Sequence, residues 1–227
     1  MNSKRYNANT RLCSLQIIEY PFFTIEECDD IKRYAYKKED DLIKDGHQDT
    51  DSDAYSKAIT TNNYFRYNFF RDYPQYAERF VDFLKKTDKD LGWPLEWPIL
   101  VQSWVNIYRK GEGIEWHNHP GIMGKSFAAN IFIDGPTLPG TTYVDAFGQD
   151  RIEEVNKENH KGYIQVFPCA LNHKVNPVTA ERISVGITFH SFEYLDKEMI
   201  RTYAMNSNIT PNTIILNDGP LSMFRDN

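Results

Sequence analysis

The chain has 227 residues, 26 Lys+Arg against 32 Asp+Glu, a formal net charge of −6 and a hydrophobic fraction of 41%. That fraction excludes wholesale disorder, and a mean hydropathy of −0.60 without any long apolar run excludes a membrane span. The acidic balance disfavours a nucleic-acid substrate. The first fifteen residues carry no apolar segment and the three cysteines form no CxxC pair. We therefore expect no secretory signal, no disulfide framework and a cytoplasmic protein.

The length predicts a single domain over residues 1–227, organised in three parts. We expect a strand and a helical support layer over 14–96. A β-rich core should follow over 97–190. The remaining residues, 191–227, are predicted to form a C-terminal helix and a tail.

The support layer is predicted to begin with a strand and a helix. Ser14–Phe23 is rich in β-branched and aromatic residues, which favours a strand. The spacing of Thr24 and Glu27 is that of a capping box, and it predicts a helix that runs to about Lys44. One face of this helix should carry an apolar stripe of Ile25, Cys28, Ile31, Tyr34 and Ala35.

A polar segment and a second helix should complete this layer. Residues 45–63 are polar and rich in turn formers, which indicates a surface loop. Pro74 is suited to a helix start, and the second helix is predicted to run to about Asp90. Its inward side chains should be Tyr76, Phe80, Phe83 and Leu84.

From residue 97 onward, short strand-like runs recur between turn clusters, which is typical of a β-sandwich or barrel. The tail should contain a short helix at Glu193–Tyr203 followed by irregular residues. The predicted strands are 99–109, 126–133, 141–147, 162–168 and 182–190.

Three of the six histidines suggest a metal site. His117 and His119 are two residues apart, so on extended backbone their imidazoles point to the same side. His173 follows a second predicted strand. Neutral imidazoles bind Fe, Zn, Cu or Ni, and three of them leave coordination positions open. A pair of histidines at this spacing is a weak signal alone, and satisfied polar side chains are the alternative. His47, His160 and His190 fit no pattern and are taken as surface or packing residues.

Arg182 is the most informative residue of the core. It lies in a strand that should be largely buried, with Ser184 on the same face. A buried guanidinium requires a partner, and its fork geometry matches a carboxylate. The partner is either an anionic ligand or one of the carboxylates of the chain. Cys169, between His119 and His173 in the sequence, has no basic neighbour and is interpreted as a small buried hydrophobe.

This series resembles the Fe(II)/2-oxoglutarate-dependent oxygenase superfamily, in particular its prolyl-4-hydroxylase-like branch. The family pattern is HxD/E, a distal His, and an Arg about ten residues later that is followed by a hydroxyl residue. Here the pattern falls on His117, His119, His173, Arg182 and Ser184. Order and spacing carry the resemblance, which covers about residues 14–190. Supporting motifs are Tyr108-x-x-Gly111, Pro139–Tyr143 and Gly162–Pro168.

The resemblance implies an α+β, mainly β fold: a double-stranded β-helix, or jelly roll, with an N-terminal helical layer. It implies a dioxygenase that hydroxylates its substrate and decarboxylates 2-oxoglutarate to succinate. Fe(II) would bind to His117, His119 and His173, with ascorbate as a reductant. The distal carboxylate of 2-oxoglutarate would bind to Arg182 and Ser184, helped by Tyr108. The substrate class is a small molecule or a peptide, with a prolyl residue favoured by the resemblance.

Several alternatives stay open at this point. His119 stands where the family usually has a carboxylate, so the third ligand is His119, Asp145 on a neighbouring strand, or no protein group at all. A cupin that binds metal without 2-oxoglutarate shares the HxH spacing but lacks its usual glutamate here. A non-catalytic jelly-roll binding module is the third hypothesis. Residues 45–72 are the expected substrate contacts, and a homodimer is one of the assemblies that the sequence allows.

Overall fold

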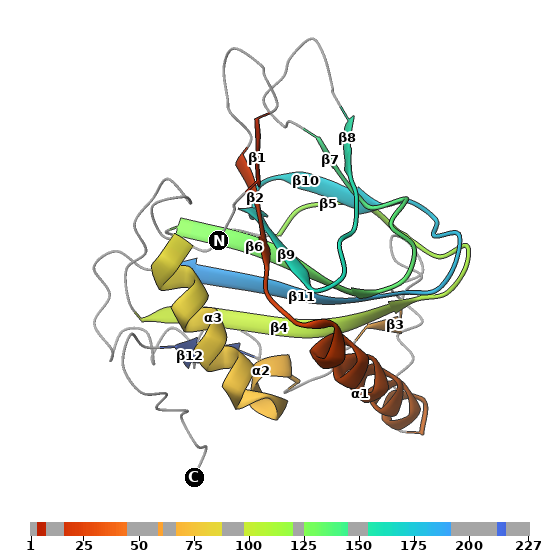
Figure 1. The fold of residues 1–227 in the computed structure, drawn as a ribbon, viewed down its shortest axis with the longest axis horizontal. Helices are drawn as coiled ribbons and strands as arrows, with labels where there is room; N and C mark the ends of the chain where they lie inside the picture. Colours follow the sequence, from red (N-terminus) through yellow and green to blue (C-terminus); the bar gives the residue numbers. More distant parts are fainter. Residues whose placement is uncertain are drawn as a thin grey trace.

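Two antiparallel β-sheets stack face to face in the computed structural model, and helices cover the outer face of the larger sheet (Figure 1). The structure describes residues 4–7, 16–44, 59–60, 67–87, 98–119, 125–144, 154–191 and 213–216. This arrangement is the predicted jelly-roll core with a helical N-terminal part.

The larger sheet has eight strands, and the smaller has four. The larger sheet runs in the order β1 (Lys4–Asn7), β2 (Gln16–Pro21), β9 (Tyr163–Pro168), β6 (Lys125–Asp134), β11 (Arg182–Ser191), β4 (Ile99–Tyr108) and β12 (Thr213–Leu216), with β3 (Ile59–Thr60) also on β4. The smaller sheet runs in the order β5 (Ile114–His117), β10 (Asn172–Val175), β7 (Thr141–Val144) and β8 (Glu154–Lys157).

Strand β11 is central and divides the interior in two. Its odd-numbered side chains, from Ile183 to Phe189, join the main hydrophobic core beneath the helices. Its even-numbered side chains, from Arg182 to His190, face the smaller sheet, because strand side chains alternate. Both faces are buried along the whole strand. The space between the sheets is therefore lined by polar side chains on a rigid central strand.

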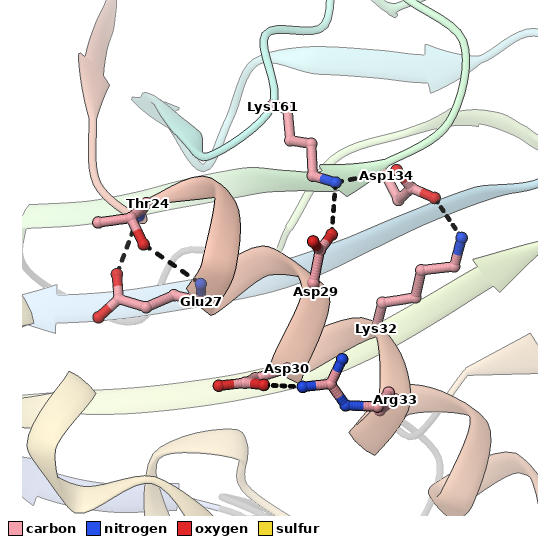
Figure 2. Close-up of polar contacts among 8 residues, drawn as sticks. All are labelled: Thr24, Glu27, Asp29, Asp30, Lys32, Arg33, Asp134 and Lys161. Atoms are coloured by element: carbon pink, nitrogen blue, oxygen red, sulfur yellow. Dashed lines mark hydrogen bonds and ion pairs between the residues drawn. The ribbon is translucent and has the colours of Figure 1, made fainter.

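Helix α1 (Ile25–Lys44) begins at the predicted capping box. The Thr24 amide donates to the Glu27 carboxylate at 2.9 Å, and the Glu27 amide donates to the Thr24 hydroxyl at 3.2 Å (Figure 2). These two bonds satisfy backbone donors that have no partner within the helix. The predicted stripe is confirmed at Cys28, Ile31 and Ala35, which are buried, whereas Ile25 in the first turn is 52% exposed.

Ion pairs help to orient α1 on the outer face of β6. Lys32 contacts Asp134 at 2.6 Å, and Lys161 bridges Asp29 at 2.7 Å and Asp134 at 3.4 Å (Figure 2). All four side chains are partly exposed, so each pair contributes only about 0–1 kcal/mol. Burial of the apolar stripe holds the helix on the sheet, and the ion pairs set its orientation.

Helices α2 (Phe69–Asp72) and α3 (Pro74–Thr87) pack beside α1 under the sheet. The inward residues predicted for α3 are buried, and Phe80 stacks against Phe70 and meets Phe189 of β11 edge-on. None of the described helices is long and apolar enough to cross a bilayer.

Some helices and strands of the structure differ from those predicted from the sequence. The segment 45–63 was expected to be a loop, yet Ile59–Thr60 forms β3 on β4, since two paired residues are too few to show periodicity. The tail was expected to be irregular after its helix, yet Thr213–Leu216 forms β12 on β4. The helix expected at 193–203 lies outside the described residues. The short strands β1, β5, β8 and β10 were not predicted.

Candidate functional site

The three predicted histidines come together where β5 and β10 pair. His117 ends β5 and lies directly opposite His173 of β10, and His119 follows two residues later. The ring centroids are 4.1 Å apart for His117 and His173, 5.1 Å for His119 and His173, and 5.5 Å for His117 and His119. One ligand nitrogen from each ring lies within 4.8 Å of the other two. Three nitrogens at this separation can converge on a single metal ion.

Backbone carbonyls set the tautomer of two of these rings. Nδ1 of His117 lies 2.8 Å from the Glu115 carbonyl, and Nδ1 of His173 lies 2.9 Å from the Leu171 carbonyl. A carbonyl oxygen can only accept, so each Nδ1 carries the proton. The lone pair is then on Nε2, which is the metal-binding arrangement for a histidine whose other nitrogen donates to a carbonyl.

Burial keeps the three rings neutral. Desolvation lowers the pKa of His119 to about 3, helped by the charges of His117 and His190 nearby. Desolvation likewise lowers the pKa of His117, and it lowers the pKa of His173 well below its ordinary value. A neutral imidazole has the lone pair that a metal needs. The triad is therefore ready to bind a cation near pH 7 without releasing protons.

Neighbouring groups hold the segment after β5 in place. The His119 amide donates to the Cys169 carbonyl at 3.0 Å, which ties this segment to the end of β9. Between the two histidines, the Asn118 amide donates to Asn172 at 3.1 Å, next to His173. The indole of Trp104 packs on His119 with ring centroids 5.8 Å apart. Cys169 itself is buried, as predicted, and desolvation raises the pKa of its thiol to about 12.

Arg182 lies in the same inter-sheet space, at the first position of β11. Its side chain is 1% exposed, and one guanidinium nitrogen donates to the Thr141 hydroxyl of β7 at 3.1 Å. Tyr108 is the register partner of Arg182 on β4, and its ring centroid lies 5.2 Å from the guanidinium carbon. Ser184 is on the same face one pleat further. The predicted co-substrate residues are thus adjacent.

The buried guanidinium has no carboxylate partner among the described residues. Its Nε atom and the Ser184 hydroxyl are buried polar atoms without a hydrogen bond in that part of the chain. The nearest acid in sequence, Glu181, instead binds Arg109 and the hydroxyl of Tyr36. An unpaired buried guanidinium costs several kcal/mol, and burial lowers the pKa of Arg182. A buried guanidinium of this kind is stabilised when an anionic ligand binds to it.

Two members of this pocket were not predicted as site residues. Thr141 receives the Arg182 hydrogen bond, and Tyr143 is fully buried beside it, with its hydroxyl donating to Gln165 at 3.0 Å. Both lie in the Pro139–Tyr143 motif that carries the family resemblance, so a signal was present. What the sequence does not show is that β7 lies over the start of β11.

Two further expectations concern this region. Asp145, the alternative metal ligand, lies outside the described residues. His190, which was taken as a surface or packing residue, is buried on the inner face of β11 and lies close enough to His119 to affect its pKa. Its Nδ1 is 2.8 Å from the Ser126 hydroxyl of β6. Strand alternation from Arg182 would have placed it on the inner face.

Solved oxygenase structures share this fold. A viral collagen prolyl hydroxylase from Paramecium Bursaria Chlorella virus-1, in its 2OG complex, is 13% identical over 78% of this chain and 96% of its own, with a TM-score of 0.51. A prolyl-4-hydroxylase from Pseudomonas putida is 15% identical over 78% and 93%, with a TM-score of 0.53. The non-heme alpha ketoglutarate dependent carbocyclase SnoK from nogalamycin biosynthesis is 13% identical over 82% and 85%, with a TM-score of 0.53.

At these identities the likeness establishes the fold. No protein-family model matches the chain, and no curated protein matches it in sequence. The chemistry must therefore be argued from its own residues.

Proposed function

We propose that the chain is an Fe(II)- and 2-oxoglutarate-dependent dioxygenase that hydroxylates its substrate and converts 2-oxoglutarate to succinate. The observation that carries this proposal is the buried guanidinium of Arg182, which has no carboxylate partner among the described residues and lies in the same inter-sheet space as the histidine triad. A metal site alone would fit many proteins. A metal site that shares its space with an unpaired buried cation fits a ligand that has a chelating end and a carboxylate end.

Three neutral imidazoles form the proposed metal site. His117, His119 and His173 would hold Fe(II), and their donor nitrogens fit a divalent metal that also needs open positions. When bound, the iron supplies the oxygen chemistry that couples decarboxylation of 2-oxoglutarate to hydroxylation. The triad contributes no negative charge, so the bound metal would keep its full 2+ charge within the protein. An anionic co-substrate suits such a site better than a neutral one.

The opposite end of the co-substrate would bind at Arg182. Its Nε and the Ser184 hydroxyl are buried donors without a hydrogen-bond partner in the described part of the chain, and a carboxylate accepts from both. Thr141 and Tyr108 position the guanidinium, one through a hydrogen bond and the other through ring contact. Charge-assisted hydrogen bonds in a dry pocket are about twice as strong as neutral ones. The protein thus contributes binding, orientation and exclusion of water at this end.

A peptidyl residue, with proline first, is the substrate class that we propose to test. Two of the proteins that share the fold are named as prolyl hydroxylases, which supports this choice. Ascorbate belongs in the assay as a variable reductant.

An anaerobic titration tests the proposal. Metal-free protein receives Fe(II) and then 2-oxoglutarate, and the visible charge-transfer band of the chelate is recorded for the wild type, His117→Ala and His119→Ala. We expect the band in the wild type and its loss or strong weakening in both variants. Thr87→Val, a buried substitution at the end of α3, is the matched control and should leave the band unchanged. Tight iron binding without a band at saturating 2-oxoglutarate would contradict the proposal and favour a cupin-like metal protein.

A further inference from the structure

A buried carboxylate lies in the same inter-sheet space as Arg182. Glu19 of β2 is 4% exposed, and Ile17 on the same face of β2 packs with Tyr143 between the sheets. A carboxylate removed from water requires a compensating partner. Among the described residues its ion-pair partner is His160, whose Nδ1 is 3.0 Å away. An imidazole is charged only when protonated, so the negative charge of Glu19 is balanced in one of the two states of His160.

A chain of hydrogen bonds links this carboxylate to the buried guanidinium. Arg182 donates to the Thr141 hydroxyl at 3.1 Å, and Thr141 donates in turn to the Tyr143 hydroxyl on the same face of β7. The Tyr143 hydroxyl donates to Oε1 of Gln165 at 3.0 Å, and Nε2 of Gln165 donates to Glu19 at 3.4 Å. Every donor points away from the cation and toward the anion. A chain with this direction is polarised by the charges at both of its ends.

The two charges at the ends of the chain both act on the Tyr143 hydroxyl. Burial raises the pKa of Tyr143, whereas the positive charge of Arg182 lowers this pKa and the negative charge of Glu19 raises it. Tyr143 is fully buried, so little water screens the two charges from each other. Glu19 is therefore a distant counter-charge for Arg182 when no ligand is bound. A carboxylate that enters the pocket must bind against the field of Glu19.

His160 connects the buried carboxylate to solvent, because its side chain is 36% exposed. Its Nε2 lies 3.8 Å from the exposed Glu158 carboxylate, and the Tyr163 ring packs on it with centroids 5.4 Å apart. On the neighbouring strands, burial lowers the pKa of Lys157 of β8 while the buried carboxylate raises it, and Lys4 of β1 is the register partner of that carboxylate. Of these side-chain types, histidine is the one that ordinarily changes charge between pH 5 and 8.

We infer that Glu19 and His160 set the affinity of the Arg182 pocket for its carboxylate ligand. Glu19 weakens binding because its negative charge opposes that of the ligand, and a proton on His160 offsets this opposition. The inference rests on the proposed function, in which the ligand is 2-oxoglutarate. Co-substrate affinity therefore rises as the pH falls and His160 gains its proton. Conversely, 2-oxoglutarate binding favours protonation of His160, since linked binding equilibria affect each other by the same factor.

Calorimetric titration measures this coupling without turnover. Protein saturated at every pH with Zn(II), which has no redox chemistry, receives 2-oxoglutarate between about pH 5.5 and about pH 8.5. Two buffers with different ionisation enthalpies report the number of protons taken up. We expect affinity about fivefold higher at the acid end, as for like charges roughly 10 Å apart in a partly screened interior. Near the middle of the range, each bound 2-oxoglutarate should take up about a third of a proton.

Two variants separate the charge of this pair from its packing. Glu19→Gln keeps the size of the side chain and an oxygen that accepts from Gln165, and it should bind 2-oxoglutarate about fivefold more tightly than the wild type at about pH 8.5. His160→Gln, at a partly exposed position, should keep the weaker affinity at every pH. Neither variant should take up protons. Glu27→Gln removes a partly buried carboxylate that pairs with Arg79 outside the inter-sheet space, and this matched control should behave as the wild type does.

The direction of the Glu19→Gln effect distinguishes a charge effect from structural damage, because a damaged pocket binds its ligand less tightly. Weaker or unchanged binding in this variant, or proton uptake that persists in both variants, would overturn the inference while 2-oxoglutarate still binds to the wild type. If 2-oxoglutarate does not bind to the metal-loaded wild type at all, the proposed function fails, and the inference fails with it.

Discussion

The indole of Trp104 lies directly over the backbone of Gly186. A Cβ atom added to Gly186 would be 2.5 Å from the Trp104 ring, closer than any tolerated contact. Absence of a side chain at this point of β11 leaves room for the indole, which contacts His119 with ring centroids 5.8 Å apart. The position of a candidate metal ligand thus depends on a glycine of the opposite sheet.

Gly186→Ala should displace Trp104 and loosen His119. Overpacking of this kind costs about 1–3 kcal/mol of stability, and we expect weaker metal binding as well. Urea unfolding and a competitive metal titration measure the two effects. Because the clash is with one ring, the penalty should be smaller when Trp104→Phe is also present. Additive losses in the double variant would contradict this relationship between the two residues.

Buried histidines should make the metal-free protein sensitive to acid. Burial lowers the pKa of His190 to about 4, whereas the unfolded chain binds that proton at about 6.5. The unfolded state therefore holds more protons between these values, and stability falls as the pH is lowered through this window. His190 alone should lower the free energy of unfolding by about 3 kcal/mol across this window. The lowered pKa values of His119 and His173 act in the same direction.

His190→Gln isolates that contribution. The variant keeps a polar side chain beside Ser126 but cannot titrate, so its free energy of unfolding should fall less steeply between pH 6.5 and about 4. Urea denaturation of metal-free protein at several pH values gives both slopes. Slopes are compared because the substitution also changes stability at pH 7. Parallel curves would show that folding does not lower the pKa of His190 and would contradict the prediction.

The two neighbouring threonines of β7 should behave differently. Thr141 accepts a hydrogen bond from Arg182, whereas Thr142 accepts from Asn156 and Asn176 at 3.1 Å each. Thr141→Val should weaken 2-oxoglutarate binding about fivefold, since one hydrogen bond that positions the guanidinium is lost. Thr142→Val should lower stability without changing 2-oxoglutarate affinity. Calorimetric titration of the metal-loaded variants measures the affinities, and equal losses in both would contradict the assignment.

Long, strongly patterned elements were predictable from the sequence. Helix α1 was predictable because the Thr24–Glu27 capping box marks its start and the apolar stripe marks its inward face. The structure confirms both. Strands β4, β6 and β11 are ten residues each, which is long enough for a mostly apolar face to be visible in the sequence. Strands β5 and β10 have four residues each, too few for a period to appear, although they carry His117 and His173.

The site was predictable only as far as local spacing reaches. His117, His119, His173 and Arg182 stand out by their order along the chain. The contact of Arg182 with Thr141 joins residues 41 positions apart and depends on how the two sheets stack. No local pattern encodes that stacking, which is why Thr141 and Tyr143 were missed. His190 was missed for a different reason, since its face follows from alternation but its proximity to His119 does not.

The central claim is that Arg182 binds the distal carboxylate of 2-oxoglutarate. It is tested most directly by anaerobic titration of the Fe(II)-loaded wild type and Arg182→Gln with 2-oxoglutarate and with 2-oxopentanoate, in which a methyl group replaces that carboxylate. The wild type should prefer 2-oxoglutarate by about tenfold or more, the contribution of a hydrogen bond to a charged group. The preference should nearly vanish in Arg182→Gln. Equal binding of both acids by the wild type, or an unchanged preference in the variant, would contradict the account.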